Sequence, residues 1–235
     1  MPVVTPDFIF GHMPKTGGTW AADYLRATTR STFVGGSHWL LRLVPEQFWE
    51  GRGALGTFRD PWSWYGSWYL HAMSEPLARK RLSQIGGGST AFKDVLEGLL
   101  VRKDTLPRHF GAMWVFEEGG DWREDFRVTG VGLWSWTARY VLGGHGRELV
   151  LLDTAQLRAA MGAALGREID EKAWPRKRVG AAGRARKLWT PELVELVGAV
   201  DGDLVEVLGW AQPFAGLGAL VLRFKDRGSS WLPLA

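Results

Sequence analysis

The sequence contains no cysteine, which excludes disulfide bonds, thiolate catalysis and thiolate metal sites. It also has no run of about 18 apolar residues, the length that a membrane-spanning helix requires. The first residues carry no basic region leading into an apolar segment of the kind that directs secretion. We therefore expect a cytoplasmic protein without a membrane partner.

The sequence also lacks a large excess of charge of either sign. The 29 lysines and arginines are nearly balanced by 25 aspartates and glutamates, which leaves a net charge of +4. The basic residues form no stripe interleaved with aromatics, so the sequence favours a small anionic ligand over nucleic acid. With 235 residues, 46% of them hydrophobic, the chain is long enough for one substantial core, and we expect a single domain over residues 1–235.

Short apolar runs alternate with helical patterns along the chain. Buried strands are predicted at 7–11, 54–58 and 148–153, with a weaker strand at 32–35. Helices are predicted at 19–28, at 62–73, after a threonine cap at Thr154, and from the N-cap Thr190 to residue 210. This alternation predicts an α/β protein, with a central parallel β-sheet flanked by helices on both faces.

The most informative stretch is FIFGHMPKTGGTW, residues 8–20, in which an apolar strand runs into glycines and then into a helix. Helix N-termini favour anions, and Gly17 and Gly18 permit close approach of the backbone. Lys15 adds a positive charge, while Thr16 and Thr19 add hydroxyls. In a nucleotide-triphosphate loop of the GxxxxGK[ST] type the lysine follows the last glycine, whereas here it precedes both.

Two further strand ends carry polar residues. Arg59 ends the predicted strand 54–58, and Ser67 lies eight residues later in the next helix, so the two side chains are candidates for clamping a second phosphate. His38 follows the weaker strand and is a candidate general base. His12 lies just before the glycine loop and is a rival for that role.

Together these residues resemble the sulfotransferases that use 3′-phosphoadenosine 5′-phosphosulfate (PAPS). In that family a Pro-Lys-[Ser/Thr]-Gly-x-Thr-Trp loop binds the 5′-phosphosulfate, and residues 14–20 match it. The family's second motif, in which a serine follows the arginine of Arg-x-Pro by eight residues, holds the 3′-phosphate; Arg59, Pro61 and Ser67 match it. Cytosolic members carry a catalytic histidine with a proline seven residues later, an interval that His38 and Pro45 reproduce.

The resemblance covers residues 7 to about 74 well and the rest loosely. It implies a P-loop-like three-layer fold and a metal-independent transfer of the sulfuryl group from PAPS to a hydroxyl. His38 would take the proton of that hydroxyl, and Lys15 with the loop amides would stabilise charge on the departing phosphate. Trp20 would stack on the adenine, and Lys177 and Arg178 approximate the family's C-terminal loop over the 3′-phosphate. One departure is Gly36, where cytosolic members have a lysine.

Two alternatives are a P-loop-type kinase and a non-catalytic nucleotide-binding protein. The kinase would need a lysine after the last glycine and a magnesium-binding carboxylate, neither of which the sequence identifies; the absence of a lysine at position 36 favours the non-catalytic protein. We expect the acceptor to be a carbohydrate or a small hydroxylated molecule. Segments 36–50, 75–120 and 130–146 are predicted to form its cleft, lined by Trp39, Trp49, Trp114, Trp122, Trp134 and Trp136.

Overall fold

One mixed β-sheet forms the centre of the computed structural model, which describes residues 2–36, 39–106, 126–172, 174, 182–208, 221–227 and 230–233. The seven strands lie in the order β3-β1-β2-β4-β5-β6-β7. Their bounds are β1 Val3–Val4, β2 Phe8–His12, β3 Thr32–Phe33, β4 Gly53–Phe58, β5 Glu148–Asp153, β6 Val221–Arg227 and β7 Ser230–Pro233.

The prediction of a parallel sheet is correct only for its centre, where β2, β4 and β5 run parallel. The strands on either side pair antiparallel, so the sheet as a whole is mixed. At one edge the reason is the length of a connection. The turn from Thr5 to Phe8 joins β1 directly to β2, and so short a link can connect only antiparallel neighbours.

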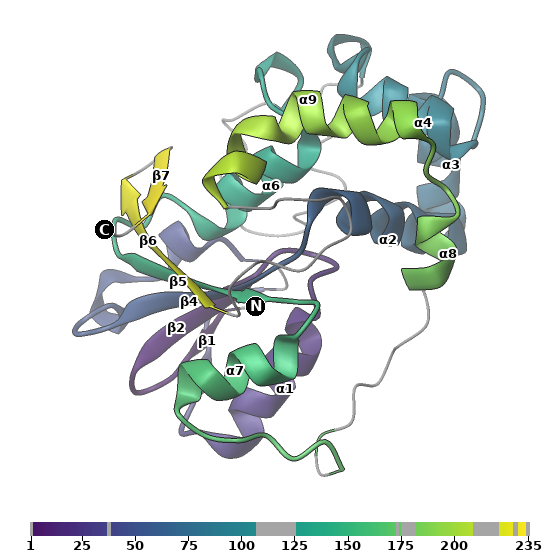
Figure 1. The fold of residues 1–235 in the computed structure, drawn as a ribbon. Coiled ribbons are helices and arrows are strands. Elements are labelled where there is room, and N and C mark those ends of the chain that lie inside the picture. Colours follow the sequence, from purple (N-terminus) through teal and green to yellow (C-terminus); the bar gives the residue numbers. More distant parts are fainter. Residues whose placement is uncertain are drawn as a thin grey trace.

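Helices cover both faces of the sheet (Figure 1). The α-helices in the described residues are α1 Gly18–Thr28, α2 Pro61–Ser74, α3 Pro76–Ile85, α4 Phe92–Leu100, α6 Leu133–Leu142, α7 Leu157–Leu165, α8 Ala182–Arg186 and α9 Pro191–Val207. Short 3₁₀ turns lie at Leu41–Leu43, Glu46–Phe48, Lys103–Thr105 and Phe126–Val128. None of the helices in these ranges is long and apolar enough to cross a lipid bilayer.

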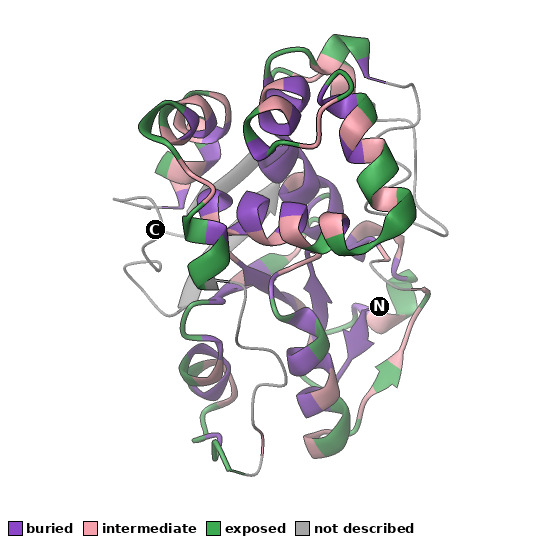
Figure 2. Cartoon of the chain, turned by 90° about the vertical axis from the view of Figure 1, so that its right-hand side faces the viewer, coloured by how far each residue is buried: buried purple, intermediate pink, exposed green. Residues whose placement is uncertain are grey.

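Alternating side chains of the central strands supply two hydrophobic clusters. Phe10 and Leu55 pack with α1 and α7 on one face, whereas their neighbours Ile9 and Ala54 join the larger cluster under α2, α6 and α9. Successive strand residues point to opposite faces, which is why one sheet serves both clusters. Figure 2 shows the buried sides of the helices turned towards the sheet and their exposed sides outward.

The predicted aromatic cleft is wrong for three of its tryptophans. Trp134 and Trp136 lie in α6, a helix that is buried almost throughout, and both belong to the larger cluster, as does Trp49. Their segments therefore contribute these rings to the core. Trp39 is half-buried, and Trp114 and Trp122 lie outside the described residues.

Candidate functional site

The glycine loop lies between the end of β2 and the start of α1, as the sequence predicts. Lys15 has a backbone φ of 67°, in the left-handed region that L-residues rarely adopt. Gly17 has a φ of 74° and is the N-cap of α1. Two left-handed residues so close together turn the chain sharply from strand into helix, and the turn needs a glycine at position 17 because a Cβ there would be strained.

Buried hydrogen bonds fix this loop to the sheet. The Thr16 hydroxyl is fully buried, donates to the Met13 carbonyl at 2.7 Å and lies 2.7 Å from the Thr57 hydroxyl on β4. The indole Nε1 of Trp64, on α2, donates to the Pro14 carbonyl at 2.8 Å. Since its hydroxyl is engaged in the interior, Thr16 can offer a ligand only its amide, whereas Thr19 is exposed.

The amides of the loop are available for an anion. Among the described residues, no acceptor meets the backbone N–H of Thr16 or Gly17. The first amides of α1, beginning at Gly18, have no partner within the helix because of its geometry. These N–H groups and the positive end of the helix dipole make a cradle for a phosphate-sized anion.

His12 packs against the base of the same loop. The residue is buried, with 8% of its surface exposed, and its ring stacks on Phe10 with centroids 5.8 Å apart. A Cβ built on Gly18 would lie 1.9 Å from the His12 ring, so only glycine fits there. This close approach explains the second glycine of the motif as a packing requirement.

A second turn lies beside the loop, at the end of β4. Asp60 is the N-cap of α2, and its carboxylate accepts a hydrogen bond from the Ser63 amide at 2.8 Å. Burial raises the pKa of Asp60 above its usual value, although its bonds to Ser63 and the charge of Arg59 act against this increase. The Arg59 carbonyl accepts a hydrogen bond from the indole Nε1 of Trp134 at 2.9 Å.

The end of β5 completes the edge and corrects one prediction. Thr154 does not cap the following helix, whose N-cap is Gln156. The Thr154 hydroxyl instead bonds to the carbonyls of Phe58 and Thr16, and it lies 3.1 Å from the latter. The buried end of β5 thus ties the glycine loop and the end of β4 together. Because the Thr154 hydroxyl makes these bonds, it does not cap the helix.

The predicted site residues meet in part. Parallel pairing places the ends of β2 and β4 side by side, with His12 opposite Thr57, so the loop of Lys15 and the turn of Arg59 share one edge of the sheet. Ser67 is half-buried on α2. Trp20 is buried on α1 and stacks on Tyr24 with centroids 5.8 Å apart. His38, Lys177 and Arg178 lie outside the described residues.

Sequence reasoning missed the residues that support the site, namely Thr57, Trp64, Trp134 and Thr154 in this role. A usable signal existed for two of them. Thr57 lies at the end of one predicted strand and Thr154 directly follows another, and the carboxyl ends of parallel strands meet at one edge. Trp64 and Trp134 give no such signal, because their partners are 50 and 75 residues away in the chain.

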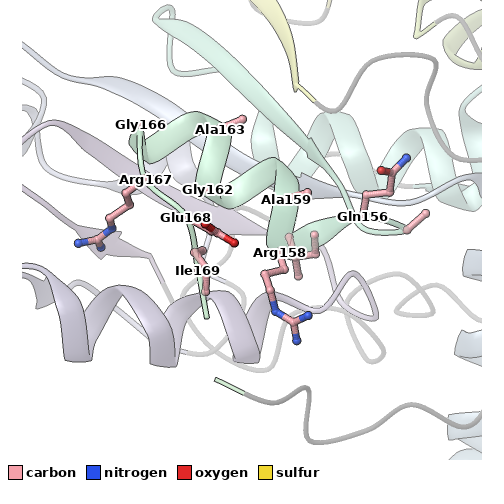
Figure 3. Close-up of a pocket in the computed structure, with 11 residues that line it drawn as sticks. Gln156, Arg158, Ala159, Gly162, Ala163, Gly166, Arg167, Glu168 and Ile169 are labelled. Carbon is pink, nitrogen blue, oxygen red and sulfur yellow. The ribbon is translucent and has the colours of Figure 1, made fainter. Parts of the chain in front are cut away.

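An open cavity of about 710 Å³ runs along α7 (Figure 3). Its lining includes Gln156 and Arg158 at the start of the helix and Glu168 and Ile169 beyond its end. None of the predicted donor-binding residues that the structure describes lines it. The cavity nevertheless begins next to the site, since Ala155 directly follows Thr154 in the chain.

In the described ranges, no three histidine or acidic side chains gather in a way that could hold a metal ion. In comparisons with protein-family models, with curated proteins and with solved structures, the chain has no match.

Proposed function

We propose that this chain is a sulfotransferase that moves the sulfuryl group of PAPS to a hydroxyl of a carbohydrate or small-molecule acceptor, on a P-loop-like sulfotransferase fold. One observation carries the proposal. The loop of Lys15 and Gly17 directs unpartnered amides and a helix N-terminus to the same sheet edge at which Arg59 directly follows the neighbouring strand β4. Two anion-binding elements on adjacent strands suit a donor with two separate phosphate groups.

The division of labour follows from these positions. Lys15 and the loop amides would hold the 5′-phosphosulfate and stabilise the charge left on the phosphate when its bond to sulfur breaks. Arg59 and Ser67 would hold the 3′-phosphate. Helix α8 packs on α2 at Gly66, the neighbour of Ser67 in the chain, where a Cβ would lie 2.9 Å from that of Ala185. Lys177 and Arg178, which precede α8 in the chain, lie outside the described residues.

The acceptor oxygen would attack sulfur as a histidine removes its proton. We assign this role to His38 because His12 is buried under Gly18 and packs on Phe10. Replacing His38 by alanine should leave affinity for 3′-phosphoadenosine 5′-phosphate (PAP) near normal and slow transfer at least about a hundredfold. The opposite pattern, an active His38→Ala protein beside an inactive but folded His12→Ala protein, would move the base to residue 12.

A thermal-shift comparison tests the donor site directly. A ligand that binds only the folded protein raises its melting temperature, and PAP should do so at concentrations where AMP and ATP with magnesium have little effect. The Lys15→Ala protein serves as the control, because it should lose most of the PAP shift. A larger shift with ATP and magnesium than with PAP would instead favour a kinase.

Transfer itself is tested with radiolabelled PAPS and a panel of sugars, phenols and alcohols. Label should move to at least one hydroxylated acceptor, and no transfer should occur with the Lys15→Ala protein. If PAP binds tightly and none of a broad panel is sulfated, the non-catalytic nucleotide-binding protein becomes the better account.

A further inference from the structure

A carboxylate is buried among the helices above the site, far in sequence from any predicted functional residue. Asp201 lies in α9 with 1% of its surface exposed. Its Oδ1 accepts a hydrogen bond from the Ser135 amide at 2.9 Å, and its Oδ2 accepts one from the Tyr65 hydroxyl at 2.8 Å. It thereby joins α9 to the first turn of α6 and to the middle of α2.

The Tyr65 hydroxyl continues this chain of hydrogen bonds towards the site. It accepts a bond from the Trp134 amide at 3.0 Å while it donates to Asp201. The same Trp134 donates from its indole to the Arg59 carbonyl at 2.9 Å. A continuous path of four residues therefore runs from Asp201 through Tyr65 and Trp134 to the backbone of Arg59.

The direction of the bonds matters. The Trp134 amide donates to Tyr65 and Tyr65 donates to the carboxylate, so the negative charge strengthens these two bonds and with them the hold on the Trp134 backbone. In Asp201→Asn the charge is lost and one of the two accepting oxygens becomes an amide nitrogen, which cannot accept, so the Tyr65 hydroxyl or the Ser135 amide loses its acceptor. The Trp134 residue, held by its backbone at one end and by its indole at the other, is the element that would move.

The surroundings of Asp201 make its charged form less favourable than it is in water. Burial raises its pKa to about 6, against the hydrogen bonds from Ser135 and Tyr65 and the positive charge of Arg139 on α6. Burial also raises the pKa of Tyr65 well above its usual value. It lowers the pKa of Lys103, and this effect outweighs the negative charge of Asp201, which raises it. Tyr65, Lys103 and Arg139 are the titratable and charged groups that the described helices and turns present to Asp201.

We propose that Asp201 is a positioning residue for the second anion-binding turn: through Tyr65 and Trp134 it fixes the backbone at Arg59, and so sets how well the site distinguishes a 3′-phosphate. This inference rests on the proposed function for its ligand, since it assigns the 3′-phosphate to Arg59. The path of hydrogen bonds itself does not depend on that assignment.

Three variants interrupt the path at different points: Asp201→Asn removes the charge, Tyr65→Phe removes the relay hydroxyl, and Trp134→Phe removes the indole donor. Tyr69→Phe is the matched control. It is the same substitution on the same helix and also removes a hydrogen bond to a backbone group, the Thr90 carbonyl at 2.8 Å, but on a path that does not lead to Arg59. Calorimetry gives the ratio of the dissociation constants for AMP and PAP in each protein.

We expect the ratio to fall about fivefold in each of the three path variants and to stay within about twofold of the parent in Tyr69→Phe. A second measurement is independent of nucleotide. In protein labelled with ¹⁵N-tryptophan, the indole signal of Trp134 is the one missing from Trp134→Phe. It should shift in Asp201→Asn and Tyr65→Phe and stay in place in Tyr69→Phe.

The two readouts separate the two proposals. If the parent binds PAP no better than AMP, the proposed function fails, and the indole signal still decides whether Asp201 controls Trp134. If the parent prefers PAP while the indole signal and the ratio are unchanged in Asp201→Asn and Tyr65→Phe, the positioning role is overturned and the donor site stands.

Discussion

The two turns at the edge of the sheet are built alike and supported differently. In each, a tryptophan indole from the helical layer holds a backbone carbonyl: Trp64 holds Pro14 and Trp134 holds Arg59. The conformation of the glycine loop is also fixed by its own residues, namely the left-handed Lys15 and Gly17 and the buried Thr16. The Arg59 turn has its local cap in Asp60 and a bond from Thr154 at the end of β4, and it also depends on α6 and α9.

This difference teaches how tryptophan is used in the chain. Among the described residues, the indoles of Trp49, Trp62, Trp64 and Trp134 each donate to a backbone carbonyl, and all four rings are buried. An indole combines a large apolar surface with a single donor, so it can fill the core and still tether a loop end. These four tryptophans therefore serve as tethers as well as core residues.

The largest effect should come from the residue that distinguishes the glycine loop. Lys15→Ala should abolish detectable sulfate transfer, a loss of at least about a hundredfold, because charge on the departing phosphate loses its cation. Donor binding should weaken by about 1.5–3 kcal/mol, as for a charged hydrogen bond, measured by calorimetry with PAP. Lys80→Ala, which removes an exposed lysine from α3, is the control and should behave as the parent. Parental PAP affinity in Lys15→Ala would contradict the assignment.

Asp201, which supports the Arg59 turn through Tyr65 and Trp134, should make the stability of the protein depend on pH. The pKa of Asp201 is about 6 in the folded protein and ordinarily 3.8, so the folded state holds its proton where the unfolded state has lost it. The free energy of unfolding should therefore fall as pH rises from about 4 to 6 and level off above, by about 2–3 kcal/mol in total.

Asp201→Asn removes this titrating group, so a comparison of the variant with the parent isolates its contribution between pH 4 and 7. The difference in unfolding free energy between variant and parent, from urea denaturation, should move in favour of the variant as pH rises from 4.5 to 7. Parallel profiles would mean that Asp201 is ionised in the folded state at acid pH. The variant should thus gain relative stability while it loses discrimination at Arg59, a combination that simple damage to the fold does not produce.

Valine variants of Thr16 and Thr19 should distinguish a residue that stabilises the fold from one that binds the donor. Thr16→Val keeps the shape but leaves the Thr57 hydroxyl and the Met13 carbonyl without this partner, which should lower the free energy of unfolding by about 1–3 kcal/mol. Thr19→Val, at an exposed position, should change stability by less than about 0.5 kcal/mol and weaken PAP binding. Equal losses of stability in the two variants would show that burial does not divide their roles.

Arg59→Ala tests the second turn at its ligand. The parent should prefer PAP over AMP by about tenfold or more, equivalent to about 1.4 kcal/mol, and the variant should lose most of this preference in competition binding. The tether to Trp134 should survive this change, because the Arg59 group that Trp134 holds is the backbone carbonyl, which alanine retains. A parent without preference would reduce the turn to a helix start.

How much of this could be predicted from sequence depends on the range of the contacts. The strand, glycine turn and helix at residues 8–28 follow from local pattern, and the predicted strands at 54–58 and 148–153 lie within one residue of β4 and β5. The sequence does not predict that the sheet is mixed. Strands β1 and β3 are only two residues long, and β6 pairs with β5 across about 70 residues of chain. The prediction of a cap at Thr154 is wrong because, although a hydroxyl before a helix usually makes one, here the carbonyls of Phe58 in β4 and Thr16 in the glycine loop compete for it. Asp201 gives no signal on an otherwise amphipathic helix, since its partners lie on α2 and α6.

The smallest effect bears on why a lysine stands at a left-handed position. Relieving the strain of a φ of 67° should stabilise the protein by about 1–2 kcal/mol, while the extra freedom of glycine in the unfolded chain should cost about 0.5–1 kcal/mol. The free energy of unfolding of Lys15→Gly should therefore equal that of the parent or exceed it by up to about 1.5 kcal/mol, although the variant loses donor binding as Lys15→Ala does. Lys80→Gly, in the interior of the regular helix α3, has no strain to relieve and should be about 1 kcal/mol less stable than the parent. Opposite signs in urea denaturation would mean that Lys15 is retained against the local preference of the backbone, as expected of a residue that serves a ligand. Equal destabilisation of both variants would mean that the Lys15 side chain stabilises the loop, and its place before the glycines would then be a matter of folding.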